Sequence, residues 1–127
     1  MSSPTDLKYT DSHEWIRIEG DTVTLGITQH AVNELTDITY VEMKGAGEEI
    51  GAGDSVGEVE SVKATSDIYS PIAGEVIGVN EGLDGDPSIV NNDPYGGGWL
   101  VKLRASDLGP ADGLMDSSAY DEKYPLD

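Results

Sequence analysis

One lysine in an otherwise acidic stretch has the residue type and surroundings for chemistry. The segment VESVKATSD, residues 59–67, places Lys63 among short uncharged side chains, and no other basic residue occurs between Lys44 and Lys102. Strand-like residues flank it on both sides, so we expect it at the tip of a hairpin. An amine there would project into solvent, where a modifying enzyme could approach it without hindrance. The plainer interpretation is a solvated turn lysine paired with Glu60 or Asp67, a contact worth less than about 1 kcal/mol.

A second group, Ser12-His13-Glu14, also has residue types used in catalysis. A working triad needs a nucleophile, a base and an orienting acid that meet in one cleft, and we identify no partner for such a cleft. The sequence has no Ser-His-Asp order, no histidine pair at metal-ligand spacing and no cysteine for a thiol nucleophile or a zinc cluster. We therefore expect neither a triad nor a metal site at His13, and a surface or packing role for His30.

The apolar residues predict many short strands. A hairpin is expected over 14–19 and 22–27, and a short helix over 29–35 with Thr28 as its N-cap. The remaining predicted elements are strands at 38–43, 55–62, 65–69, 73–79 and 99–103, a loop over 80–98 with one helical turn near 88–90, and a C-terminal helix near 112–122. This pattern favours a mainly β fold, a sandwich or flattened barrel with helices at both ends.

Length and charge limit what the chain can be. Its 127 residues suggest a single domain over 1–127, with a core at about 7–104 and a helical segment at 105–127. The net charge of −18 would repel nucleic acid and anionic membranes. Because neither a signal peptide nor an apolar run of about 20 residues is present, we expect a soluble cytoplasmic protein.

The acidity itself has two interpretations. Disorder does not account for it, since the apolar residues alternate as they do in strands. Repulsion within a folded acidic domain relaxes at high salt, because the Debye length falls from about 10 Å at 0.1 M to about 3 Å at 1 M. We therefore favour a protein adapted to a salty cytosol, while an acidic surface that recruits basic partners would have the same composition.

Three separated motifs resemble one family. They are GEVESVKATSDIYSPIAGEV at 57–76, KYTDSHEWIRIEGDTVTLGIT at 8–28 and VNNDPYGGGWLVKL at 90–103. In this order they resemble the H protein of the glycine cleavage system, from about Leu7 to Tyr120. The resemblance implies a barrel-sandwich hybrid like that of lipoyl domains, built of two small sheets. It also implies that Lys63 carries lipoate in amide linkage.

The same resemblance implies a carrier rather than an enzyme. The lipoyl arm would take the aminomethyl group of glycine from a pyridoxal-phosphate decarboxylase (P protein) to a tetrahydrofolate-dependent aminomethyltransferase (T protein). A flavin dihydrolipoyl dehydrogenase (L protein) would reoxidise the arm, and a separate enzyme would attach the lipoate. In the family, the positions of Ser12, Glu14 and Asp67 line the place where the loaded arm rests. Spacing alone would give these three residues ordinary turn and strand-edge roles.

Three alternative functions compete with that of a glycine cleavage carrier. A biotin carrier typically has methionine on both sides of its lysine, whereas Lys63 lies between Val62 and Ala64. An H-like protein that passes lipoate to other enzymes would have the same sequence features as a glycine cleavage carrier. An acidic interaction module with an unmodified Lys63 belongs to a different class, and the mass of the native protein distinguishes it from any carrier.

Overall fold

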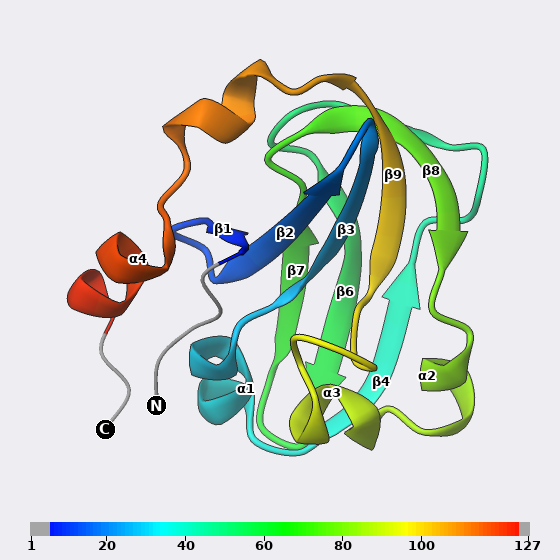
Figure 1. Cartoon of the computed structure of the whole chain (residues 1–127). Coiled ribbons are helices and arrows are strands. Elements are labelled where there is room, and N and C mark those ends of the chain that lie inside the picture. The colour runs from blue at the N-terminus through cyan, green and yellow to red at the C-terminus, as the bar shows by residue number, and fades with distance from the viewer. Residues whose placement is uncertain (1–5, 125–127) are drawn as a thin grey trace.

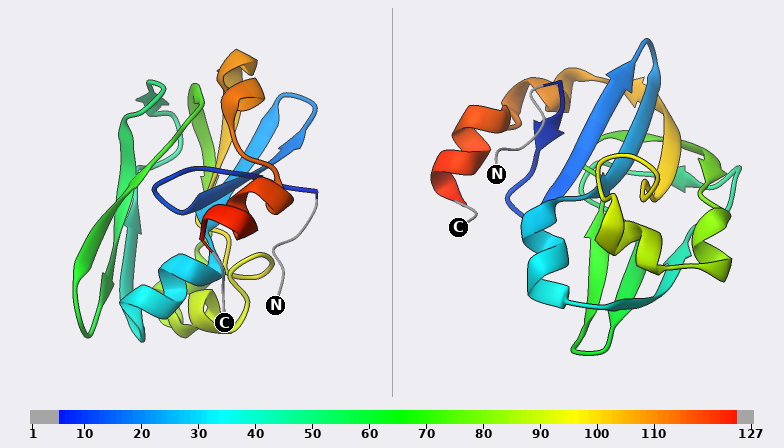
Figure 2. Two further views of the ribbon diagram at one scale, coloured as in Figure 1. Left: turned by 90° about the vertical axis from the view of Figure 1, so that its left-hand side faces the viewer. Right: turned by 60° about the horizontal axis from the view of Figure 1, so that its bottom comes forward.

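The computed structural model describes residues 6–124, and they form two antiparallel sheets that face each other (Figures 1 and 2). The larger sheet has the strand order β1-β2-β3-β9-β8-β5, and the smaller one has the order β4-β6-β7. The strands are β1 (Lys8–Tyr9), β2 (Glu14–Glu19), β3 (Thr22–Ile27), β4 (Ile38–Met43), β5 (Glu49–Ile50), β6 (Ser55–Ser61), β7 (Thr65–Tyr69), β8 (Ala73–Val79) and β9 (Val101–Asp107).

The main core lies between the two sheets. Val23, Leu25 and Leu103 from the larger sheet are fully buried, and Val59 and Ile68 from the smaller sheet are buried in the same cluster. Val59, Ile68 and Leu103 alternate with more exposed neighbours because side chains of a strand point to opposite faces in turn, whereas β3 is buried on both faces. Burying each of these side chains contributes about 1.5–3 kcal/mol. The hydrophobic pattern therefore fixes which face of each strand points inward.

The helices are short and lie at the ends of the sheets. They are α1 (Gln29–Leu35), α2 (Gly82–Gly85), α3 (Ser88–Asn92), the 3-10 helix η1 (Gly109–Gly113) and α4 (Ser117–Lys123). As predicted, the Thr28 side chain caps α1 by accepting a hydrogen bond from the Ala31 N–H. No helix among residues 6–124 is long and apolar enough to span a membrane.

Several predicted boundaries were wrong. In the expected loop 80–98, α3 confirms the helical turn predicted near 88–90, whereas α2, anchored by the buried Leu83, was missed. Strand β9 begins two residues later and ends four residues later than the predicted strand 99–103, because it continues to pair with β8, where Gly74 lies opposite Ala105. Short helices were expected beyond residue 105, and the structure has two, but the one expected at 112–122 is divided between the end of η1 and α4.

A second, smaller core attaches the C-terminal helix to the start of the chain. It consists of the buried residues Leu7, Tyr9, Trp15 and Tyr120. The rings of Tyr9 and Tyr120 stack with their centroids 4.8 Å apart, and the Tyr120 hydroxyl lies 2.7 Å from the Thr28 hydroxyl. Helix α4 thus packs beside β1 and α1 and belongs to the folded body of the protein (Figure 1).

Candidate functional site

Lys63 lies in the tight connection between β6 and β7, the protruding tip at the bottom of the right-hand view in Figure 2. The Ser61 N–H donates to the Ala64 carbonyl at 2.8 Å, which closes a hairpin around Val62 and Lys63. The Ser61 hydroxyl accepts hydrogen bonds from the backbone N–H groups of Lys63 and Ala64 at 3.1 and 3.0 Å. These contacts define the backbone of the tip, as the sequence predicted.

Lys63 is exposed, and its amine contacts the backbone of α1. Its Nζ donates to the backbone carbonyl of Glu34 at 3.3 Å. Within the described residues Lys63 forms no ion pair, so the expected pairing with Glu60 or Asp67 is absent. The neighbouring Val62 is 68% exposed and adds apolar surface to the tip. An acylating enzyme therefore meets an unpaired amine on a well-defined support.

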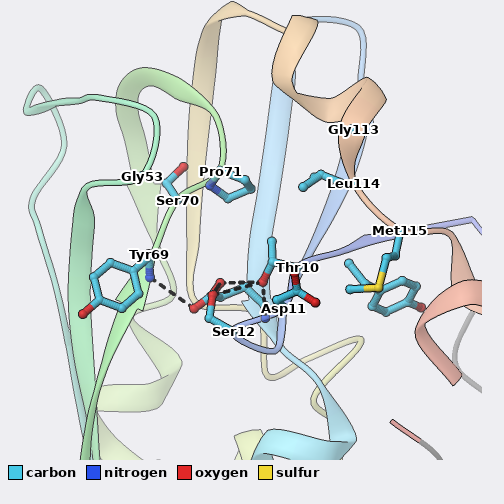
Figure 3. A pocket seen from close by; sticks show the side chains of 12 residues that line it. Thr10, Asp11, Ser12, Gly53, Tyr69, Ser70, Pro71, Gly113, Leu114 and Met115 are labelled. Carbon is cyan, nitrogen blue, oxygen red and sulfur yellow. Dashed lines mark hydrogen bonds between the residues drawn. The ribbon is translucent and has the colours of Figure 1, made fainter. Parts of the chain in front are cut away.

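A pocket of about 230 Å³ lies at the other end of β7 (Figure 3). Its walls come from three segments far apart in sequence: residues 9–12 with Glu14 at the start of β2, residues 69–71 at the end of β7, and residues 113–115 before α4. Gly53 completes the lining. None of these lining residues is basic. The pocket therefore has no cation of its own that would compete with a bound ligand for its polar groups.

Glu14 is the buried acid of this pocket, with only 2% of its surface exposed. Its Oε1 accepts hydrogen bonds from the hydroxyls of Thr10 at 2.7 Å and Ser12 at 2.6 Å, and its Oε2 accepts one from the Tyr69 N–H at 3.3 Å (dashed lines in Figure 3). Burial raises the pKa of Glu14, while these hydrogen bonds act in the opposite direction. The arrangement holds one carboxylate in a fixed orientation, suited to binding a cationic amine.

Asp67 lies outside this pocket. It lines a separate, acidic depression on the smaller sheet together with Glu42 and Glu58. Since Asp67 and Tyr69 are two residues apart on β7, both side chains point to the exposed outer face of that sheet. Tyr69 connects the two sites, since its hydroxyl lies 3.5 Å from Asp67 Oδ2 and its N–H reaches Glu14.

Two of the three predicted docking residues, Ser12 and Glu14, are thus in contact. The third, Asp67, lies on β7 two residues before Tyr69. The contributions of Thr10 and of the Tyr69 backbone were missed. The sequence signal for Thr10 is weak, because it consists of one hydroxyl four residues before Glu14, at the turn into β2. The Tyr69 N–H has no sequence signal, because any residue except proline supplies it.

The structure also brings the two histidines together, contrary to expectation. The ring centroids of His13 and His30 are 4.3 Å apart and their planes are inclined by 23°. Pairing of Glu14 with Ile27 places His13 beside Thr28, whose N–H donates to the His13 carbonyl, and His30 follows two residues later. The hairpin register therefore contained the signal, which the search for short histidine spacings missed. Burial, and to a smaller extent the neighbouring His30, lowers the pKa of His13.

Comparison with known proteins gives consistent matches. The model of the family described as "Glycine cleavage H-protein" matches residues 7–125. The chain is 53% identical to "Glycine cleavage system H protein 2, mitochondrial" of Arabidopsis thaliana over 115 residues, which are 91% of this chain and 74% of that protein. It is 50% identical to "Glycine cleavage system H protein" of Myxococcus xanthus (strain DK1622) over 117 residues, 92% of this chain and 91% of that protein.

A solved structure agrees with the fold. The crystal structure of a glycine cleavage system H protein from Mycobacterium marinum matches with a TM-score of 0.89 and 39% sequence identity. The match covers 98% of this chain and all of the other. The predicted barrel-sandwich hybrid of two antiparallel sheets is thereby confirmed.

Proposed function

Since this chain belongs to the glycine cleavage H-protein family, we propose that it bears lipoate in amide linkage on Lys63 and carries the aminomethyl group of glycine on that arm. It is a carrier subunit of the glycine cleavage system, and its own residues position cargo for enzymes that make and break the bonds. The observation that supports this proposal best is the position of Lys63 at the exposed tip of the β6–β7 hairpin, where its amine forms no ion pair with any described residue.

The residues around Lys63 fit an attached arm. The Ser61 side chain organises the turn, and the adjoining Ala64 is small and exposed, so neither obstructs the amine. Exposed Val62 supplies an apolar contact for the arm or for the enzyme that attaches it. A site on a defined turn between two paired strands presents its amine more reproducibly than a flexible loop would.

When bound, lipoate supplies a disulfide that accepts the aminomethyl group and two electrons. From the Lys63 Cα to the ring, the arm has about a dozen bonds of about 1.5 Å, which span roughly 15 Å in an extended zigzag. Along β7, Asp67 lies roughly 13 Å and Tyr69 roughly 20 Å from Lys63 at about 3.3 Å per residue. An arm laid along β7 therefore passes Asp67 and ends roughly 5 Å short of Tyr69, at the approach to the Glu14 pocket.

We assign the pocket residues to the cargo. Glu14 offers a fixed carboxylate to the cationic amine, and Ser12 is the exposed hydroxyl at the mouth of the pocket. Asp67 lies on the outer face before the pocket and would guide the amine electrostatically rather than hold it in the pocket. Sheltering the amine there slows the loss of a labile group between enzymes.

The partners follow from this cycle. They are the glycine decarboxylase that loads the arm, the aminomethyltransferase that unloads it, the dihydrolipoyl dehydrogenase that reoxidises it and a lipoate-attaching enzyme. Each must reach the hairpin tip, which protrudes from the body of the sandwich (Figure 2). Because the net charge of this chain is −18, we expect each partner enzyme to have a basic docking surface around the entrance to its own active site.

A reconstituted assay tests this function. Unmodified chain is lipoylated with a lipoate ligase and ATP, then mixed with the three enzymes, glycine, tetrahydrofolate and NAD. The parent and the Lys44→Arg control should both support NADH formation, whereas Lys63→Arg should support none, because its guanidinium cannot be acylated. Equal activity of Lys63→Arg would contradict the proposal. A lipoylated parent that is inactive here but passes its lipoyl group to another carrier domain would indicate a lipoate relay.

A further inference from the structure

The cluster His13, His30 and Glu34 has no role in the carrier function described above. His13 lies immediately before β2, while His30 and Glu34 are one turn apart on α1 and therefore share one face of that helix. One nitrogen from each histidine and one oxygen of Glu34 all lie within 4.8 Å of one another. Both imidazoles are partly buried and the carboxylate is exposed, so Glu34 has the freedom to adjust its position.

His30 has an unsatisfied nitrogen at the centre of the cluster. Its Nδ1 is buried and has no hydrogen-bond partner among the described residues. Glu34 Oε1 lies 3.2 Å from this atom and would form an ion pair with a protonated His30, but no hydrogen bond joins the two atoms. Because a buried polar atom without a partner costs about 1–3 kcal/mol, such an atom needs an explanation.

His13 is held in place through its other nitrogen. Its Nδ1 lies 2.8 Å from the Tyr120 hydroxyl, which in turn lies 2.7 Å from the Thr28 hydroxyl. With Nδ1 engaged, Nε2 is the nitrogen left to bind a ligand, and a hydrogen bond at the opposite nitrogen is the usual orienting contact of a metal-bound histidine. The backbone of His13 has a φ of 70°, a left-handed conformation that is uncommon for a residue with a side chain and recurs at binding sites.

We propose that His13, His30 and Glu34 bind one divalent transition-metal ion of the zinc type. Two imidazoles and one carboxylate are the ligands that such ions take in sites with three protein ligands, and the fourth position is then left to water. Metal binding would satisfy His30 Nδ1 and would link the loop before β2 to α1. The site is independent of lipoylation, although Glu34 also contacts Lys63 through its backbone carbonyl.

Packing alone is the competing explanation. His13 and His30 also contact the ring of Tyr124, so the two imidazoles could simply be part of the aromatic cluster that holds α4. Packing accounts for the stacked rings, and metal binding would require the His30 ring to turn out of this stack, because two nearly parallel imidazoles cannot both direct their in-plane lone pairs at one ion. Packing accounts neither for the carboxylate beside His30 nor for the left-handed backbone of His13. If the cluster is a metal site, it should bind Zn²⁺ in preference to Mg²⁺. If packing alone explains it, no such preference is expected.

The test uses untagged full-length protein, stripped with EDTA and dialysed into 0.3 M KCl. Nonspecific binding of cations to a chain of charge −18 is the main hazard, and excess Mg²⁺ suppresses it because Mg²⁺ prefers oxygen ligands. Zn²⁺ is titrated calorimetrically with and without Mg²⁺, and the imidazole NMR signals are followed in parallel. Only two histidines occur in the chain, so these signals report on this cluster alone.

We expect one Zn²⁺ per chain in the presence of Mg²⁺, with the signals of both histidines shifting together. His30→Gln and Glu34→Gln should each weaken binding by at least about tenfold, the lower end of the loss caused by removing an outer contact of a metal site. The matched control Glu19→Gln removes an equal charge far from the cluster and should bind as the parent does. Zn²⁺ binding that Mg²⁺ abolishes, or that is equal in parent and His30→Gln, would overturn the proposal in favour of packing.

Discussion

The backbone N–H of Tyr69 donates to Oε2 of Glu14 at 3.3 Å and so joins the two sheets. Tyr69 ends β7, the strand that begins next to Lys63, while Glu14 begins β2 in the larger sheet. The strand that supports Lys63 therefore also helps to orient the carboxylate that we propose binds the cargo. This single contact couples the root of the arm to the place proposed for its cargo.

Glu14→Gln should shorten the life of the bound aminomethyl group. The amide has nearly the same shape but no negative charge for the cationic amine. A hydrogen bond to a charged group contributes roughly 1.5–3 kcal/mol when it is sheltered and less in a partly wet pocket. Decay without the aminomethyltransferase should therefore quicken by about tenfold at most, since 1.4 kcal/mol is a factor of ten.

Two further variants make that decay experiment specific. Asp67→Asn should have a smaller effect than Glu14→Gln because Asp67 lies outside the pocket. Glu19→Gln, on the same strand but exposed at the distant turn, serves as the control. If Glu14→Gln retains its load as long as the parent does, the arm is protected in another way.

The same substitution should stabilise the metal-free fold at neutral pH. Because burial raises the pKa of Glu14 in the folded state, the folded protein binds this proton more tightly than the unfolded chain does. The parent therefore loses stability as pH rises from the unfolded pKa through the folded one. Above that pH range the parent has the full free-energy cost of burying an ionised Glu14, whereas the neutral glutamine does not have this cost.

Urea unfolding from neutral to acidic pH, with EDTA present, measures this effect. The stability advantage of Glu14→Gln over the parent should shrink as pH falls through that range, since protonation also removes the penalty in the parent. The difference in the free energy of unfolding between the two proteins is compared, because the contribution of repulsion among the other acids is the same in both and cancels. An advantage that does not change with pH would assign the effect to the amide hydrogen bonds instead.

Ser61→Ala should loosen the hairpin tip without unfolding the sandwich. The change removes one hydroxyl that accepts from two backbone N–H groups, those of Lys63 and Ala64. Since the tip is exposed and water can replace the hydroxyl, we expect a loss of about 1 kcal/mol or less. Amide hydrogen exchange at these two residues should accelerate, and lipoylation should slow.

The matched control for the tip is Ser66→Ala, whose hydroxyl makes only a 3.5 Å contact with the Asp67 carbonyl. It should exchange and accept lipoate as the parent does. If Ser61→Ala and Ser66→Ala are indistinguishable in both measurements, the Ser61 hydroxyl does not organise the turn.

Salt should stabilise the protein strongly. With a net charge of −18, repulsion weakens the fold at low ionic strength, and screening relieves it. Thermal melting should therefore shift upward between low salt and molar potassium chloride. Sulfate at matched ionic strength separates screening from strengthened apolar burial, and a melting temperature that is flat in chloride would favour an acidic surface that recruits partners.

The sequence was informative wherever a local pattern repeated. Alternating apolar residues predicted the β2–β3 hairpin, and the small residues around Lys63 predicted the β6–β7 tip. The two-residue strands β1 and β5 were missed, since so short a stretch shows no alternation. Strand β9 was predicted too short for a related reason, because its last residues are held by pairing with β8 and have little hydrophobic signal of their own.

The site was only partly predictable because its parts meet through tertiary structure. Ser12 and Glu14 are close in sequence, and their contact is local. The separation of Asp67 from Glu14 depends on which face of β7 carries the Asp67 side chain and on where β7 meets the start of β2. The contact of His13 with His30 depends on the register of a hairpin. Neither relation can be deduced from residue type without the strand pairing.

The central claim is that Lys63 alone carries lipoate, and mass spectrometry tests it most directly. The full-length chain is expressed in cells supplied with lipoate, its intact mass is measured, and the adduct is located by peptide mapping. The account predicts one lipoyl group per chain, on Lys63, and none on Lys63→Arg of equal folded stability. A parent chain that remains unmodified, or an adduct that maps to Lys44 or Lys102, would contradict it.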